Sequence, residues 1–125
     1  MQLTQENPDF AYVLRGVSED GVLVNQRTLS TSFLVSADRL VEDWRPRSAD
    51  DLQPEDFEAV LALQPAVVLL GTGPRQRFPS PAAMAALLTR GIGIEVMDAA
   101  AAARTFNVLA TEGRRVVAAF LLPGP

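Results

Sequence analysis

Pro65-Ala66-Val67-Val68-Leu69-Leu70 is an uninterrupted apolar run that leads directly into Gly71-Thr72-Gly73-Pro74-Arg75-Gln76-Arg77-Phe78-Pro79. An apolar run bounded by proline and glycine is typical of a strand buried on both faces, and therefore of a sheet covered by helices. Ligands of such open sheets sit beyond the carboxyl ends of the strands, where this glycine loop lies. The segment predicts an α/β fold with residues 67–70 as a central, buried strand, and it places a candidate site at the loop.

The residues before this segment predict antiparallel strands. We expect strands over residues 10–17, 22–24 and 32–36. Ser18-Glu19-Asp20-Gly21 is expected to form the first turn, because an Asp-Gly pair tolerates positive φ, and residues 25–27 are expected to form a second turn. Residues 39–44 fit either a short strand or a helical turn, and residues 45–53 lack an apolar period and predict a connecting loop.

Helices alternate with strands from residue 54 onward. Pro54, followed by two acidic residues, indicates a helix start with negative charge near the positive end of the dipole, and Pro65 ends that helix. The later elements are a helix from Ser80-Pro81 to Gly91, a strand over residues 92–97, a helix from its cap Asp98 through Glu112, and a strand over residues 115–122. Short strand–helix–strand links imply right-handed parallel crossovers, and we interpret residues 1–125 as a single domain.

The composition excludes several classes of chemistry. Cysteine, histidine and lysine are absent, and all 11 basic residues are arginine. The chain therefore has no disulfide, thiolate or imidazole, no His- or Cys-based metal site and no Schiff-base lysine. We expect no cofactor and no metal, and the interpretation leans away from an enzyme. The net charge of −4 also argues against nucleic acid as a partner.

Two segments bear on the location of the protein in the cell. The most apolar stretch, residues 67–70, is far shorter than the roughly 20 residues that span a bilayer. Residues 1–9 contain acidic but no basic residues, so they match neither the basic n-region of a signal peptide nor a mitochondrial transit segment. The expectation is a cytoplasmic protein without an integral membrane segment.

The glycine loop is expected to contribute to an anion-binding crevice. If the two apolar strands are parallel neighbours, their carboxyl ends bring Gly71-Thr72-Gly73 beside Asp98. Free N–H groups at the helix starts, together with Arg75 and Arg77, would suit a carboxylate or a phosphate. Alternatively, the glycines only shape a turn and both arginines are solvated. The match to a phosphate-binding fingerprint is weak, because a third glycine is missing and Pro74 lacks an amide donor.

Carboxylates are the remaining candidates for a general base. Glu95 lies in an otherwise apolar strand, where burial would favour its protonated form; a solvent-facing or arginine-paired Glu95 is the alternative. Asp98 fits a helix N-cap better than a catalyst. Arg104 and Asn107 share a face of the third helix, which indicates either a partner-binding stripe or a solvated surface. No residue is assigned a catalytic role.

Four segments, taken in order, resemble a known family. They are Gly71-Thr72-Gly73, Gly91-Ile92-Gly93-Ile94-Glu95-Val96-Met97-Asp98, Arg104-Thr105-Phe106-Asn107-Val108-Leu109 and Glu112-Gly113-Arg114. Together they resemble the family of the mitochondrial complex I assembly factor 3, which also contains the adipogenesis-associated domain protein and many bacterial members. The resemblance covers about residues 12–122, and the chain departs at Ala99, where many relatives carry Thr.

This resemblance implies both a fold and a role. The implied fold is a three-layer α/β domain in which helices flank a small central mixed sheet, with an additional N-terminal antiparallel β layer. The implied role, that of the mitochondrial member, is a non-enzymatic accessory role; the bacterial members mostly lack an assigned activity.

Two functional hypotheses follow. The first is an assembly or accessory factor that binds an unidentified protein partner through the surface near the glycine loop and the third helix. The alternative is a binder of an anionic small molecule, or a simple carboxylate-dependent enzyme, that uses the crevice with Glu95 as base and Arg75 or Arg77 holding the anion. The candidate binding residues of the two hypotheses are Gly71, Thr72, Gly73, Arg75, Arg77, Glu95, Asp98, Arg104 and Asn107.

Overall fold

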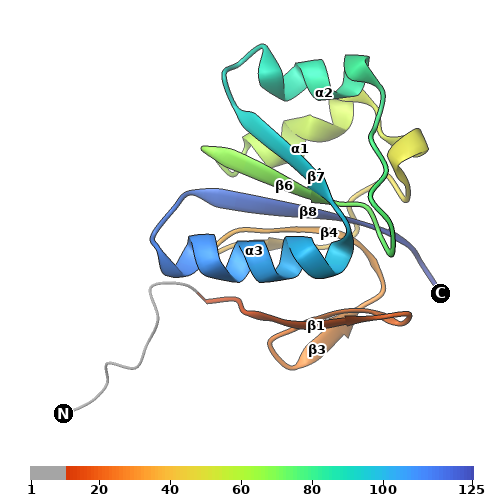
Figure 1. The fold of residues 1–125 in the computed structure, drawn as a ribbon, viewed down its shortest axis with the longest axis vertical. Coiled ribbons are helices and arrows are strands. Elements are labelled where there is room, and N and C mark those ends of the chain that lie inside the picture. The colour runs from red at the N-terminus through yellow and green to blue at the C-terminus, as the bar shows by residue number, and fades with distance from the viewer. Residues whose placement is uncertain (1–10) are drawn as a thin grey trace.

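Two β-sheets and three α-helices make up residues 11–125, the part of the chain that the computed structural model describes (Figure 1). The N-terminal sheet is antiparallel and has the order β1-β2-β3. Its strands are β1 (Leu14–Ser18), β2 (Gly21–Val24) and β3 (Arg27–Leu29). The two residues Glu19 and Asp20 link β1 to β2, and Gly21 adopts φ +135°, so the expected Asp-Gly turn forms a tight hairpin.

The second sheet has five strands in the order β5-β4-β8-β6-β7. Its strands are β4 (Thr31–Val35), β5 (Leu40–Val41), β6 (Val67–Gly71), β7 (Gly93–Met97) and β8 (Val116–Pro123). β6 runs parallel to β7 and β8, whereas β4 runs antiparallel to β8 and β5. The helices are α1 (Phe57–Leu61), α2 (Pro81–Leu88) and α3 (Ala99–Thr111). The mixed α/β fold expected from the sequence is confirmed.

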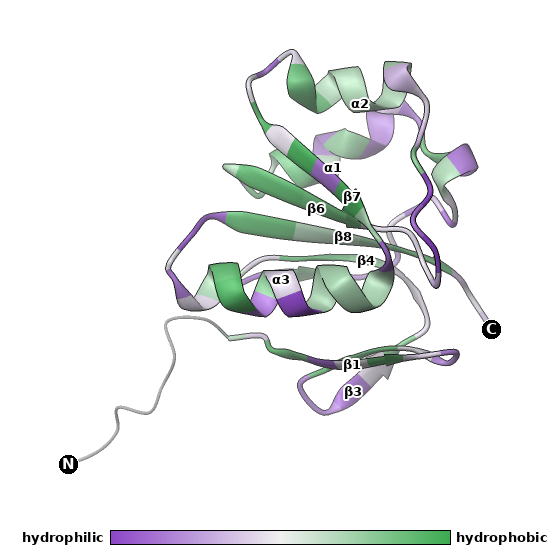
Figure 2. Cartoon of the chain, viewed as in Figure 1, coloured by the Kyte–Doolittle hydropathy of each residue, from purple (hydrophilic) through white to green (hydrophobic). Residues whose placement is uncertain are grey.

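The five-stranded sheet separates two hydrophobic cores. Val68 and Leu70 of β6 pack in the core beneath α1 and α2. Leu69, which points to the opposite face, packs in the core formed with α3 and the three-stranded sheet. The order of layers is therefore α1 and α2, the large sheet, α3, and the small sheet (Figure 1). β6 and β8 are hydrophobic along their length, whereas β1 and β3 carry hydrophilic residues (Figure 2).

Several predicted boundaries need correction. β3 was not expected, because a strand of three residues with two exposed side chains has no apolar pattern, and its first residue, Arg27, was placed in the turn. β1 begins at Leu14 rather than at residue 10, which lies outside the described residues, as does the acidic segment 1–9. β6, which was expected to be the central strand, is an interior strand between β8 and β7, and the middle strand of the five is β8.

The remaining differences concern the connection between the N-terminal strands and α1. The ambiguous segment 39–44 contains the short strand β5, and the expected loop 45–53 contains a 3-10 turn over Ala49–Asp51. The helix expected from Pro54 is a 3-10 turn over Pro54–Asp56 followed by only five α-helical residues.

Arg45 organises the turn before α1. Its guanidinium donates hydrogen bonds to both carboxylate oxygens of Asp56, at 2.9 and 2.7 Å, and to Oδ1 of Asp51 at 3.0 Å. The Asp56 carboxylate also accepts the Gln53 backbone N–H at 2.8 Å. The hydrogen bonds from Arg45, assisted by the one from Gln53, hold the pKa of Asp56 below its ordinary value of 3.8.

This lowered pKa predicts a loss of stability in acid. The unfolded chain binds a proton at Asp56 more readily than the folded protein does, so the stabilisation is present above about pH 5 and is lost as the pH falls through 3.8 towards the folded pKa. We expect Asp56→Asn to show a smaller difference in the free energy of unfolding between pH 7 and pH 3 than the wild type shows, measured by urea denaturation. Asp50→Asn, at an exposed neighbouring carboxylate, should keep the wild-type difference. Equal differences in all three proteins would contradict the assignment.

Candidate functional site

The glycine loop and the start of α3 meet where β6 and β7 end. The Thr72 N–H donates to the Met97 carbonyl at 2.9 Å, and the Ala99 N–H donates to the Gly73 carbonyl at 2.7 Å. The parallel register of β6 and β7 therefore brings residues 71–73 beside Asp98.

Gly71 serves the packing of the sheet against α3. A Cβ atom at this position would lie 2.9 Å from Cδ1 of Phe120 and 3.1 Å from Cβ of Ala102, both too close for ordinary contact. Gly73 has a different requirement, because its φ of +97° is unfavourable for residues with a side chain. Both glycines thus have structural reasons that need no ligand.

Thr72 holds the loop that follows it. Its buried hydroxyl donates to the carbonyl of Arg75 and accepts the N–H of Arg77 at 3.0 Å. The side-chain amide of Gln76 donates to the Val96 carbonyl at 2.9 Å, which ties the same loop to β7. The hydroxyl of Thr72 is therefore engaged in shaping residues 74–79, which we call the arginine loop.

The two candidate carboxylates have simple environments. Asp98 is the N-cap of α3, because its Oδ1 accepts the Ala101 N–H at 2.8 Å. Glu95 pairs in register with Leu69 but is exposed, because β7 is the edge strand and α3 packs against β6 and β8. This is the solvent-facing alternative for Glu95, and neither carboxylate gives support to the enzyme hypothesis.

The polar face of α3 divides into two parts. Arg104 is exposed, as expected for either a partner contact or a solvated surface. Asn107 instead binds β1: its Oδ1 accepts the Leu14 N–H at 3.0 Å, and its Nδ2 donates to the Leu14 carbonyl at 2.7 Å. Asn107 therefore joins α3 to the small sheet, a role that its place in a polar stripe did not indicate.

The arginine loop exposes two arginines and an aromatic ring to solvent. Arg75 and Arg77 are exposed, and neither forms an ion pair with any of residues 11–125. Phe78 follows them with 64% of its surface exposed. Sequence analysis did not single out Phe78, although an aromatic residue between arginine and proline, outside any apolar period, was a usable signal.

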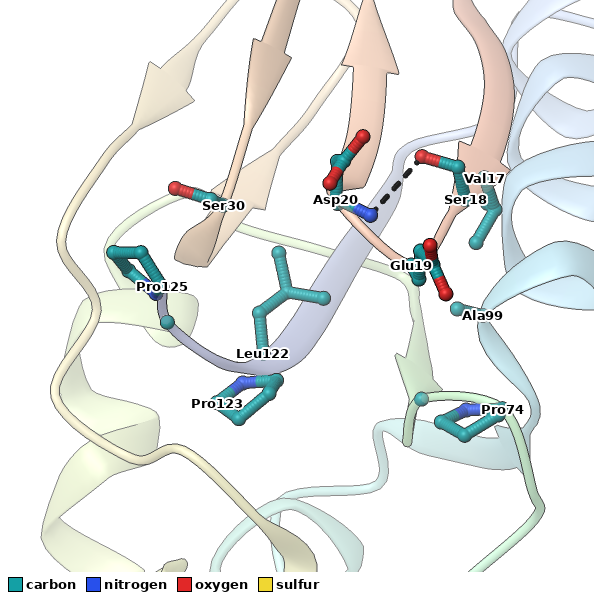
Figure 3. Close-up of a pocket in the computed structure, with 13 residues that line it drawn as sticks. Val17, Ser18, Glu19, Asp20, Ser30, Pro74, Ala99, Leu122, Pro123 and Pro125 are labelled. Atoms are coloured by element: carbon teal, nitrogen blue, oxygen red, sulfur yellow. Dashed lines mark hydrogen bonds between the residues drawn. The ribbon is translucent and has the colours of Figure 1, made fainter.

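A cavity of about 660 Å³ opens beside the glycine loop. Its walls come from residues 17–21 of the β1–β2 hairpin, from Gly73 and Pro74, from Ala99, and from residues 122–125 (Figure 3). Among the nine predicted site residues, Gly73 alone lines it. A hollow thus exists at the expected edge of the sheet, but its lining is mostly apolar, and the arginines expected to hold an anion lie outside it.

Within residues 11–125, no group of three or more Asp, Glu, His or Cys side chains is arranged to hold a metal ion. None of the helices in this part of the chain combines the length and the apolar character needed to cross a membrane.

Comparison with known proteins gives consistent matches. The family described as "Protein of unknown function (DUF498/DUF598)" matches residues 14–121. NADH dehydrogenase (ubiquinone) 1 alpha subcomplex assembly factor 3 of Bos taurus is 32% identical over 127 residues, which cover 100% of this chain and 68% of that protein. Because these matches run from β1 to β8, they concern the whole fold, and they confirm the resemblance expected from the sequence.

Solved bacterial structures agree with this result. The solution structure of a Xanthomonas campestris protein is 55% identical with a TM-score of 0.83, covering 99% of this chain and 94% of that chain. A Mth938-like domain protein of Bordetella pertussis is 28% identical with a TM-score of 0.81, again covering 99% of this chain and 94% of that chain.

Proposed function

This chain belongs to the DUF498/DUF598 family, and we propose that it is a non-enzymatic assembly factor that acts by binding a partner protein. The observation that carries the proposal is the similarity, over the whole of this chain, to a protein named for the assembly of NADH dehydrogenase. An assembly factor needs a surface for its partner rather than a reactive centre. Glu95 and Arg104 are both exposed to solvent, which fits that requirement.

We place the partner surface on the arginine loop. Arginine and aromatic residues are enriched where protein interfaces derive most of their binding energy, and Arg75, Arg77 and Phe78 are exposed together here. The hydrogen bonds of Thr72 and Gln76 hold the loop backbone before any partner arrives. A surface that is already ordered loses less conformational entropy on binding.

The charge of the loop indicates the chemistry of the partner. The whole chain carries a net charge of −4, so two neighbouring arginines without acidic partners among residues 11–125 form a local positive patch. Such a patch favours an acidic partner surface with a pocket for the Phe78 ring, and it should make capture faster at low salt.

Site-specific photocrosslinking tests this proposal. A benzoylphenylalanine placed at position 78 should give a crosslinked product of defined mass in the native cell. The same probe at position 88, where Leu88 is 54% exposed at the end of α2, should not. The opposite result, a product at position 88 and none at position 78, would move the partner surface away from the loop.

Removal of the two arginines should weaken capture without unfolding the protein. We expect Arg75→Ala/Arg77→Ala to change the free energy of unfolding by less than about 0.5 kcal/mol, as for exposed sites, and to reduce the crosslinked product at position 78. Arg39→Ala/Arg90→Ala removes the same charge from other exposed positions and should leave the product unchanged. If the loop variant loses stability and keeps the product, the arginines only anchor the loop.

The same arginine pair supports a second candidate function, the binding of an anionic small molecule. Inorganic phosphate or citrate would then raise the melting temperature of the wild type and not that of Arg75→Ala/Arg77→Ala. A ligand present at about 100 times its dissociation constant stabilises a protein by about 2.7 kcal/mol, which a thermal scan detects readily. A shift with these anions and no crosslinked product would favour this candidate over the assembly role.

A further inference from the structure

The cavity beside the glycine loop carries a separate inference. We propose that it binds an organic cation with an apolar body, of which an aliphatic amine is the simplest example. The proposal rests on the lining of the cavity and not on the arginine loop, so it stands or falls independently of the proposed function.

The size and walls of the cavity suit a small organic ligand. Binding sites for small molecules commonly enclose about 300–1,000 Å³ and are lined mainly by apolar groups. This cavity encloses about 660 Å³, and Val17, Pro74, Ala99, Leu122 and Pro123 supply apolar wall. Leu122 extends from β8 towards the hairpin turn, opposite Pro74 in the close-up view (Figure 3). An aliphatic chain would be removed from water against these side chains.

The cavity exists because small residues meet where the two sheets separate. Ala99 begins α3 with only a methyl group, and Gly73 provides no side chain in the glycine loop. A Cβ atom at Gly73 would meet no other heavy atom within 4 Å, so the space beside it is open. The hollow is therefore bounded by three ordered elements of the fold.

The charged residues of the lining indicate which charge the ligand should carry. The charged side chains that line the cavity are Glu19 and Asp20, both exposed at the hairpin turn, and neither forms an ion pair within residues 11–125. The Asp20 N–H donates to the Ser18 hydroxyl at 3.2 Å, which orders the turn that carries them (Figure 3). These two carboxylates, at the hairpin turn beside the cavity, attract a cation and repel an anion.

The start of α3 does not reverse this preference. A helix N-terminus favours negative charge, and Ala99 belongs to the wall of the cavity. Asp98, however, already places its carboxylate on the Ala101 N–H and so supplies that negative charge from within the protein. The cavity therefore combines apolar walls with the negative charge of Glu19 and Asp20.

Titration with three probes of equal chain length tests the proposal. Octylammonium, octanol and octanoate, each below its micelle-forming concentration, are added to the 15N-labelled protein while amide resonances are recorded by NMR. We expect octylammonium to shift the resonances of Gly21, Gly73, Ala99 and Gly124, and to bind at least tenfold more tightly than octanoate. Octanol should fall between them, because it has the apolar body without the charge.

Charge variants supply the matched control. Glu19→Gln/Asp20→Asn should weaken octylammonium binding about five- to tenfold and leave octanol binding unchanged, because only the charge beside the cavity is lost. Glu55→Gln/Glu58→Gln removes two exposed carboxylates on the opposite side of the large sheet and should leave both affinities unchanged. Tighter binding of octanoate, shifts confined to residues away from the cavity, or an octylammonium affinity indifferent to Glu19→Gln/Asp20→Asn would each overturn the proposal.

Discussion

Replacing Leu69 by alanine is expected to lower the free energy of unfolding by about 2–5 kcal/mol. The side chain is 1% exposed and packs between the large sheet and α3. Its backbone lies in the middle of β6, paired with Glu95 of β7 on one side and Ala118 of β8 on the other. Truncation removes the apolar contacts of three carbon atoms and leaves a cavity between the sheet and α3. The strand that carries the residue is held by its pairing with β7 on one side and with β8 on the other. Because β6 is an interior strand, the surrounding layers have little freedom to collapse into that space.

Denaturation by urea, followed by the fluorescence of Trp44, measures this loss. Trp44 is buried in the opposite core, so its signal reports unfolding of the whole protein rather than a local change at Leu69. Val108→Ala is the matched control, since it also shortens an apolar side chain but at a position that is 55% exposed. We expect the control to change stability by less than about 0.5 kcal/mol. A loss below about 1 kcal/mol for Leu69→Ala would be incompatible with its place between the two layers.

Features with a local signal could be predicted from the sequence. Ser80 and Asp98 each accept a backbone N–H three residues later, from Ala83 and Ala101, as their position before an apolar helix indicated. β6 was equally clear, because an apolar run between proline and glycine leaves few other interpretations. The parallel links then followed from the alternation of strands with helices.

Features that depend on a distant partner could not be predicted. Residues of β3 are strand-like only because β2 offers them a ladder, and their own pattern of one buried side chain in three carries no period. Leu14 and Asn107 are 93 residues apart, so nothing near either residue shows that they bind each other. The 3-10 turn before α1 likewise depends on Arg45, which reaches Asp56 across 11 residues.

The candidate site shows the same division. Its position at the end of β6 was predictable from topology, and a cavity does open there. The character of the cavity was not predictable, because its carboxylates come from the hairpin of the other sheet and part of its apolar wall from the end of β8. Arg75 and Arg77 were expected on the loop beside the crevice, and the structure exposes both side chains on a loop whose backbone is held by Thr72 and Gln76.

The small sheet depends on Asn107 in a way that can be measured. Its amide group accepts the N–H of Leu14 and donates to the carbonyl of the same residue, as a neighbouring strand would. β1 is an edge strand of its sheet, so this side chain satisfies backbone groups that β2 does not reach. Asn107→Ala removes both hydrogen bonds and leaves partly buried polar groups unpaired. We expect a loss of about 1–3 kcal/mol in the free energy of unfolding.

Amide hydrogen exchange separates this role from a general loss of stability. In Asn107→Ala the Leu14 amide, which loses its acceptor, should exchange faster by a larger factor than the amide of Phe120 in the middle strand β8. Arg104→Ala, an exposed change almost one turn earlier on the same helix, should affect neither amide and cost less than about 0.5 kcal/mol. Asn107→Asp keeps an acceptor for the Leu14 N–H but loses the donor, so it should protect that amide better than alanine does. If Leu14 exchanges no faster than the global change requires, β1 is held by its contacts with β2 and the core, and the Asn107 amide adds nothing to them.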